Sequence, residues 1–233
     1  MKFENTEVFG VKSAVRGMRN PLSSWDKSDS VYDEETETLI IGKNDAELAK
    51  KLVNAGTEHR KFLRQIFVSV DITAPLYFWK EFDTYKVGVT SNSTSTMHTI
   101  SKNPITIDCF ETDDFQRNLL VSSITADSWA LDNTGVERIE RSIVEKIIPF
   151  LEGLRRKYLE TNDKRYWKEL IRWLPESWLQ KRTITMNYEN VANICKQRRN
   201  HKLNEWSGQD NPECDNFIAW AETLPCVKEF GIV

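Results

Sequence analysis

One short segment constrains the fold of this chain more than any other: a strand pattern that runs into a proline and then into an aromatic helix pattern. Apolar Ile66, Val68, Val70 and Ile72 alternate with Gln65, Phe67, Ser69 and Asp71. A period of two residues is typical of a half-buried strand. Pro75 suits the first turn of a following helix, in which Phe78, Phe82 and Tyr85 fall on one face. The segment predicts a strand that leads directly into an aromatic helix.

Two helices with capping signals flank this segment at a distance. Asn44 and Glu47 have the spacing of a capping box, and Gly56 stands where that helix would end. Thr134 and Glu137 repeat the capping pattern ahead of a long apolar stripe. The stripe consists of Ile139, Ile143, Ile147, Leu151, Leu154 and Tyr158. It predicts a spine helix of about 24 residues, with a kink at Pro149.

Three further helices are predicted in the C-terminal third. The first should end near Leu174-Pro175, because the residue before a proline disfavours the helical conformation. The second is capped by Asn187, and the third spans residues 212–222. The first is marked by Tyr166, Leu170 and Trp173, the second has Val191, Ile194 and Cys195 facing inward, and the third carries Phe217, Trp220 and Ala221. The balance of patterns predicts a helix-rich α+β fold with few strands.

Composition narrows the class of protein. The 233 residues are 39% hydrophobic and 29% charged, which is typical of a globular chain and predicts one domain. A formal net charge of −3 provides no overall attraction to a nucleic-acid polymer or an acidic membrane. The sequence has neither a membrane-span pattern nor a signal-peptide core, so we expect a cytoplasmic protein. The four cysteines are expected to be reduced, and no metal site is indicated.

A basic cluster stands out against this acidic background. Residues 181–202 contain seven basic side chains and one acidic residue, Glu189. The seven are Lys181, Arg182, Lys196, Arg198, Arg199, His201 and Lys202. Arginine binds phosphate through paired hydrogen bonds, so the cluster indicates an anion site. The alternative is a solvated helix C-terminus whose cations stabilise the helix dipole.

A second polar segment is rich in hydroxyl groups. Residues 90–96 supply six hydroxyls and one amide, and we expect them to form a loop able to surround a phosphate with donors. The alternative is an ordinary solvated turn. The phosphate-loop, dinucleotide-binding, serine-hydrolase and zinc-protease motifs are absent. His59, His98 and His201 stand far apart in the sequence and define no catalytic group by themselves.

The order of these features resembles the flavin-dependent thymidylate synthases (ThyX-like). In that family a histidine precedes a strand, a proline opens the next helix, and an Arg-His-Arg run is followed by seven residues and a serine. His59, the strand and Pro75 keep this spacing. Thr84-Tyr85-Lys86 stand at the Arg-His-Arg run, and Thr94 stands at the serine. The chain departs from the family at Asn92, Thr96 and Arg64, which stand where the family has a glutamate, an arginine and an acidic residue near the flavin.

The C-terminal half resembles the family more closely by spacing. The family has a Leu-Pro segment, then a helix with two asparagines six residues apart and an arginine five residues further. Leu174-Pro175, Asn187, Asn193 and Arg198 reproduce this without insertion, and Asn204-Glu205-Trp206 are similar to its Gln-Trp-Glu neighbourhood. The resemblance covers residues 40–206. It implies a single α+β domain with a small antiparallel sheet packed with long helices, an N-terminal extension (1–39), a core (40–206) and a helical tail (207–233).

The resemblance also implies a chemistry. Members of the family methylate dUMP with FAD, a reduced nicotinamide and methylenetetrahydrofolate, and they assemble as homotetramers. By position, the residues expected to bind the nucleotide are Arg198, Lys86, Ser93, Thr94 and Ser95. Those expected to bind the cofactor are His59, Asn187, Asn193, Tyr85 and Asn92. No residue is assigned as catalytic.

Three functions stay open on the sequence. The first is a divergent enzyme that methylates or hydroxymethylates a pyrimidine nucleotide. The second is a non-catalytic protein on the same scaffold that captures a nucleotide, such as a signalling nucleotide. The third is an interaction module whose charges are structural. Lys86 keeps a positive charge where the family has arginine, but an ammonium lacks the planar, two-pronged contact of a guanidinium. Recognition of a phosphate or a uracil edge must therefore differ from that of the family.

Overall fold

The computed structural model describes residues 1–36, 38–112 and 143–233, and the chain divides into two compact units. We call residues 1–73, 80–93 and 181–233 the sheet unit. Residues 74–79 and 94–180 form the helical unit, of which 113–142 lie outside the described residues. Three elements run from one unit into the other: β4 (Phe67–Pro75), α3 (Leu76–Phe82) and β6 (Leu179–Asn187).

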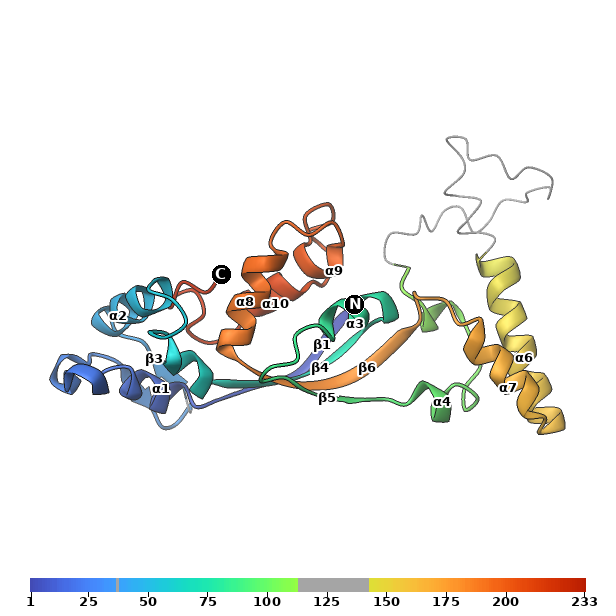
Figure 1. The fold of residues 1–233 in the computed structure, drawn as a ribbon, viewed down its shortest axis with the longest axis horizontal. Helices are drawn as coiled ribbons and strands as arrows, with labels where there is room; N and C mark the ends of the chain where they lie inside the picture. The colour runs from blue at the N-terminus through green and yellow to red at the C-terminus, as the bar shows by residue number, and fades with distance from the viewer. Residues whose placement is uncertain (37, 113–142) are drawn as a thin grey trace. The chain divides into compact units, whose positions relative to one another are not determined.

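The sheet unit contains most of the strands (Figure 1). Its first elements are β1 (Lys2–Phe9), α1 (Val11–Gly17), the 3₁₀ turns η1 (Asn20–Leu22) and η2 (Trp25–Lys27), β2 (Val31–Asp33), β3 (Thr38–Ile40), α2 (Lys43–Asn54) and η3 (Lys61–Gln65). Its later ones are β5 (Thr90–Ser93), α8 (Tyr188–Arg198), α9 (Asn204–Ser207) and α10 (Phe217–Glu222). The main sheet has the order β1-β4-β6-β5, and β2 and β3 form a separate pair. Antiparallel pairing joins β1 to β4 and β5 to β6.

The predicted strand and the helix after it are confirmed as β4 and α3. Val68, Val70 and Ile72 are fully buried, whereas Ser69 and Asp71 face the other side of the sheet, where they contact hydroxyls of β6. Figure 1 shows α8, α9 and α10 over one face of this sheet. The period-two pattern therefore marks a strand with one apolar face under helices and one polar face. The edge strand β1 comes from residues 1–39, the N-terminal extension expected from the sequence.

The expected loop over residues 90–96 is wrong in its first half, because Thr90–Ser93 form strand β5. All four residues are exposed, so no apolar alternation marks them as a strand. Pairing with β6 decides their conformation, with Ser91 opposite Ile184 and Ser93 opposite Arg182. Successive side chains of a strand point to opposite faces. Ser91 and Ser93 therefore share one face of the sheet and Asn92 lies on the other, so the hydroxyls do not surround a single point.

The helix patterns after residue 160 are confirmed with small shifts at their ends. The helical unit holds α7 (Lys164–Arg172), which ends before Leu174-Pro175. Asn187 caps α8 as predicted, in a reciprocal capping box with Asn190. The last helix, α10, is shorter than the range predicted. The earlier helix α2 is also present, but its capping box at Asn44 is wrong: Asp29, from a distant loop, accepts the Asn44 backbone N–H at 3.0 Å.

The helical unit packs around its own apolar cluster. Its other elements are α4 (Thr96–Thr99), η4 (Ile107–Cys109), the π-helical turn η6 (Ile143–Ile147) and α6 (Ile148–Thr161). The cluster is formed by Ile100, Ile105, Phe110, Ile148, Leu151 and Leu170. Pro149 lies in the first turn of α6, directly after η6, so the change from the π-helical to the α-helical turn falls beside this proline. The capping pair Thr134 and Glu137, with Ile139, lies outside the described residues.

Three features of the structure bear on the class of protein. All four cysteines are free thiols. No group of three potential metal ligands occurs in the part of the chain that is described. Among the same residues, no helix has the length and apolarity needed to cross a membrane.

A half-buried carboxylate in α6 makes the stability of the helical unit depend on pH. Glu152 accepts hydrogen bonds from the Arg155 guanidinium at 2.7 Å and from the Ile105 backbone N–H at 2.9 Å. The Arg155 hydrogen bonds, more than any other contact, lower the pKa of Glu152 from its ordinary 4.5 to about 2. Because the folded pKa lies below the unfolded one, this stabilisation is complete above pH 4.5 and is lost as the pH falls toward 2.

We therefore expect Glu152→Gln to flatten the acid limb of the stability curve. Urea unfolding followed across that pH range should give a smaller loss of free energy in the variant than in the wild type. An acid limb of unchanged slope would contradict this prediction. Lys157→Met is the matched control, because Lys157 pairs with Glu160 on an exposed part of the same helix.

Candidate functional site

The candidate site begins with a turn after α3 that is held against the start of α8. The Asn190 side-chain amide donates to the Val87 carbonyl at 2.7 Å. Gly88 has a φ of +75°, in the region that favours glycine. A Cβ on Gly88 would lie 2.9 Å from the Asn187 amide nitrogen. The cap of α8 thus fixes the path of the chain between α3 and β5.

Replacing Gly88 with alanine is expected to destabilise the protein by about 1–2 kcal/mol, because both the positive φ and the Asn187 contact oppose a Cβ. Gly153→Ala is the matched control. Gly153 lies inside α6, and no described atom beyond the backbone of its own helix lies within 4 Å of where a Cβ would stand, so the same substitution there should stabilise by about 0.5–1 kcal/mol. Chemical denaturation measures both. Equal effects of the two substitutions would show that the Gly88 turn is not constrained.

Behind this turn lies a cluster in which one guanidinium has several partners, which we call the Arg198 cluster: Glu81, Tyr85, Arg198, His201 and Trp206. Arg198 Nε donates to the Tyr85 hydroxyl at 2.9 Å, and its Nη1 lies 3.0 Å from Glu81 Oε2. The guanidinium carbon lies 4.8 Å from the Trp206 ring centroid, within the range of a cation–π contact. Trp206 is fully buried. The cluster joins α3, α8 and α9 through contacts far apart in sequence.

His201 has two polar neighbours. The Leu203 backbone N–H donates to His201 Nδ1 at 3.2 Å. His201 Nε2 lies 3.2 Å from Glu81 Oε2. His201 and Arg198 therefore share one carboxylate oxygen of Glu81.

A small cavity opens beside the Arg198 cluster. It has a volume of about 140 Å³ and is lined by Phe82, Asp83, Tyr85, Lys86, Val89 and Ser91. Asp83 is paired with Arg182 at 2.7 Å, whereas Lys86 is exposed and has no ion-pair partner among the residues that the structure describes. Binding pockets for whole small molecules usually measure about 300–1,000 Å³. This cavity suits one fragment of a ligand, with two aromatic rings, an ammonium and a hydroxyl around it.

A second polar cluster lies where η3 meets the first half of α8, and we call it the Glu189 cluster: Arg60, Arg64, Glu189 and Asn193. Arg60 donates to Glu189 Oε1 at 3.0 Å and to the Asn193 side-chain oxygen Oδ1 at 2.9 Å, and Arg64 donates to Glu189 Oε2. Burial raises the pKa of Glu189, but the hydrogen bonds from Arg64 and Arg60 outweigh it, so the pKa lies below its ordinary value. Two guanidiniums on one carboxylate leave the cluster with a net positive charge.

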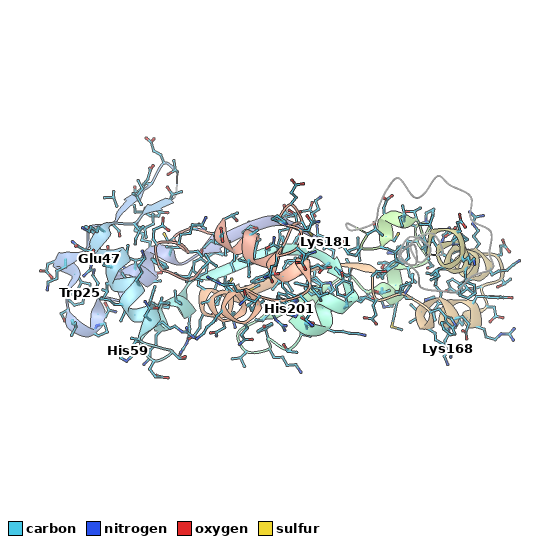
Figure 2. All side chains as sticks on the ribbon, turned by 90° about the horizontal axis from the view of Figure 1, so that it is seen from above. Trp25, Glu47, His59, Lys168, Lys181 and His201 are labelled. Carbon is cyan, nitrogen blue, oxygen red and sulfur yellow. The ribbon has the colours of Figure 1, made fainter. Side chains whose placement is uncertain are left out.

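The structure brings together only part of the set of residues expected from the sequence. Tyr85 and Lys86 line the cavity, and Arg198 contacts Tyr85. Asn187 caps α8, and Asn193 belongs to the Glu189 cluster. His59 is exposed and lies on a different part of the sheet unit from His201 (Figure 2). Thr94 and Ser95 belong to the helical unit, where their carbonyls accept from Gln180 and from the N–H groups of α4.

Most of the basic cluster predicted over residues 181–202 is paired within the chain. Lys181 lies 3.2 Å from both Glu4 and Asp71, Arg182 pairs with Asp83, and Arg198 and His201 share Glu81. Lys196, Arg199 and Lys202 are exposed and form no ion pair with another residue that the structure describes, as expected of a solvated basic surface. Residues 181–202 contain a single acidic residue, Glu189. Folding brings acidic side chains from β1, β4 and α3 next to the basic ones.

Sequence reasoning missed the acids and the cations that come from outside the conspicuous segments. Glu81 and Asp83 were not singled out, and Arg60 was not connected with Glu189. The local signal for Glu81 and Asp83 was their place at the end of the aromatic helix, on either side of Phe82. No local signal marks Arg60, whose partners lie 129 and 133 residues away in the chain.

Comparisons with known proteins complete the description of the site. The sequence matches no family model and no curated protein sequence. Its structure is similar to that of the flavin-dependent thymidylate synthase ThyX from Helicobacter pylori complexed with FAD and dUMP, with a TM-score of 0.58 at 16% identity over 99% of this chain and 97% of that chain. A second structure of the same enzyme with FAD and dUMP gives a TM-score of 0.59 at 18% identity over 99% and 96%. The chain thus has a helix-rich α+β fold with a small antiparallel sheet, like that of ThyX.

Proposed function

We propose that this protein binds a pyrimidine nucleotide at the cavity beside Tyr85 and Lys86, and that it modifies the base with the help of a flavin. One observation carries the proposal. A cavity lined by two aromatic rings, an exposed ammonium and a hydroxyl occurs in a chain that matches, over 99% of its length, the structure of an enzyme crystallised with FAD and dUMP. A planar base and a phosphate are the two fragments that such a lining would recognise.

In this proposal the two ends of the nucleotide meet different groups. Lys86 provides a mobile positive charge for the phosphate, as ammonium groups do in many phosphate sites. Ser91 lines the cavity and Ser93 lies on the same face of β5, so both can donate a hydroxyl to a phosphate oxygen. Asp83 is neutralised by Arg182 and therefore opposes an anion less than an unpaired carboxylate would.

The residues of the Glu189 cluster fit an anionic cofactor by the chemistry of their donors. The donors suited to the phosphates of FAD are Arg60, Arg64 and the Asn193 amide. His59 is exposed and is the neighbour of Arg60 in the sequence. When bound, FAD supplies electron transfer, with methylenetetrahydrofolate as the one-carbon donor and a reduced nicotinamide as the reductant. The chain's own part is to bind and orient the nucleotide and to exclude water. We propose a homotetramer for the assembled protein.

The first experiment identifies what co-purifies with the protein. Mass spectrometry of the denatured preparation, with an absorbance spectrum over the flavin bands, should reveal FAD. Calorimetric titration with dUMP, dCMP, UMP and CMP should then give one preferred nucleotide. Failure of all four to bind, in a folded preparation, would overturn the proposal.

Removal of the Lys86 charge tests the cavity itself. Lys86→Met is expected to weaken binding of the preferred nucleotide about tenfold, which corresponds to about 1.4 kcal/mol. Arg156→Met is the control: Arg156 is exposed and pairs only with Glu152 on α6 among the described residues, so binding should be unchanged. Equal affinities for wild type and Lys86→Met would exclude Lys86 as a phosphate ligand.

A non-catalytic nucleotide-binding protein is the second candidate, and one observation favours it. In the Glu189 cluster both guanidiniums already donate to Glu189, which reduces their capacity to hold a flavin pyrophosphate. A colourless protein that releases a nucleotide on denaturation would support this function over the enzymatic one.

A further inference from the structure

Arg198 is held by partners within its own chain on several sides. Its Nε donates to the Tyr85 hydroxyl, its Nη1 faces Glu81 and its planar group lies over Trp206. Only 18% of the side chain is exposed. A guanidinium in this setting would have to give up contacts before it could form a bidentate pair with a phosphate.

Tyr85 is the member of the Arg198 cluster that reaches the cavity. Its hydroxyl accepts from Arg198 Nε at 2.9 Å and donates to the Gln197 side-chain carbonyl at 3.0 Å. Both partners come from the last turn of α8. The ring packs edge-on against Trp206, with centroids 6.3 Å apart. A second edge-on contact, with Phe82, also has centroids 6.3 Å apart. Two hydrogen bonds at the hydroxyl and two ring contacts fix the orientation in which the Tyr85 ring lines the cavity.

We infer that Arg198 is a positioning residue for Tyr85, and that the ligand of the Tyr85 ring is the planar base of the nucleotide. This inference rests on the proposed function and assigns the recognition of base and phosphate to different residues. Arg198 acts on the base through Tyr85, whereas Lys86 acts on the phosphate. Glu81 contributes to the same positioning, because its Oε2 pairs with Arg198 Nη1. His201 lies against the same oxygen of Glu81.

The geometry of the guanidinium group explains why this role needs arginine and not lysine. One planar group donates from Nε to the Tyr85 hydroxyl, places Nη1 in an ion pair with Glu81 and presents its face to an indole. A lysine at position 198 would provide a single ammonium nitrogen for both acceptors. Arg198→Lys should therefore retain the charge and lose the positioning.

The test compares two probes, deoxyuridine and dUMP, which differ only in the phosphate. If Arg198 acts through Tyr85, Arg198→Met weakens both probes by the same factor, about tenfold, and Arg198→Lys does the same. Lys86→Met, in contrast, weakens dUMP and leaves deoxyuridine unchanged. Titration calorimetry or competition against a fluorescent nucleotide measures the affinities.

A double-mutant cycle of Arg198 and Tyr85, measured with dUMP, tests the positioning role independently. Tyr85→Phe removes the hydroxyl that Arg198 holds, so Arg198→Met should add little in the Tyr85→Phe background. Additive effects, or a loss confined to dUMP in Arg198→Met, would overturn the positioning role and leave nucleotide binding intact. Failure of the wild type to bind either probe would instead overturn the proposed function.

Folding of the variants does not limit the test. Gln197 is exposed and supports the other side of the Tyr85 hydroxyl, so Gln197→Ala should weaken both probes equally without a change in melting temperature. If Gln197→Ala leaves both affinities at the wild-type value, the hydroxyl does not position the ring and the inference is wrong.

Discussion

Asp45→Ala is expected to lose about 3–5 kcal/mol of stability, the cost of breaking a buried ion pair by removing one partner. Asp45 is fully buried, and its Oδ1 accepts from Arg19 Nε at 2.6 Å. Its Oδ2 accepts from the hydroxyls of Ser28 and Ser30 at 2.7 and 2.6 Å. Without the carboxylate, a guanidinium that is 4% exposed and two serine hydroxyls lose their acceptor.

Urea denaturation at neutral pH measures this loss. Glu160→Ala is the control, because Glu160 and Lys157 form a pair in which both side chains are 58% exposed, and such pairs contribute about 0–1 kcal/mol. Burial raises the pKa of Asp45, but the hydrogen bonds from Ser30, Ser28 and Arg19 lower it by more. The pKa of Asp45 therefore lies below its ordinary value. Its stabilisation is therefore present at neutral pH and falls in acid. A loss for Asp45→Ala no larger than that for Glu160→Ala would refute the prediction.

Trp206→Ala is expected to cost about 3–5 kcal/mol, the usual range for a large buried aromatic side chain. Trp206 is fully buried and packs against Phe82, Tyr85 and Phe217. It also carries the Arg198 guanidinium on its face. The variant should therefore lose nucleotide affinity in addition to stability.

Trp173→Ala provides the comparison for this substitution. Trp173 is 59% exposed at the end of α7, so its removal should change stability by less than about 1 kcal/mol. Thermal unfolding with and without dUMP separates the two effects of Trp206→Ala. Wild-type affinity in a destabilised Trp206→Ala protein would mean that the indole supports the fold and not the site.

Elements with a local hydrogen-bonding or periodic signal could be predicted. The alternation through Val68, Val70 and Ile72 identified β4, and the proline after it identified the start of α3. The Asn187 cap identified α8 because its hydrogen bond closes on Asn190, three residues away. In each case the physical cause lies within a few residues, so the sequence alone contains it.

Elements whose conformation depends on distant partners could not be predicted. β5 consists of exposed polar residues, and its strand conformation comes from pairing with β6, about 90 residues later in the chain. The first turn of α2 is capped by Asp29 and not by the local Asn44 pattern. The spacing of Arg198 indicated a residue that binds the nucleotide, and only the structure shows its neighbours, Glu81 from α3 and Tyr85 from the turn after it.

The sequence by itself determined the helix-rich α+β class, the strand β4 and the helices that follow the patterned segments, because main-chain hydrogen bonding and the burial of one face act over a few residues. Only the tertiary structure decided which charges are free and which are paired. Ion pairs such as Arg198 with Glu81 and Arg60 with Glu189 join residues more than a hundred positions apart. No local pattern records such a partner, and the partner decides whether a cation can bind a ligand.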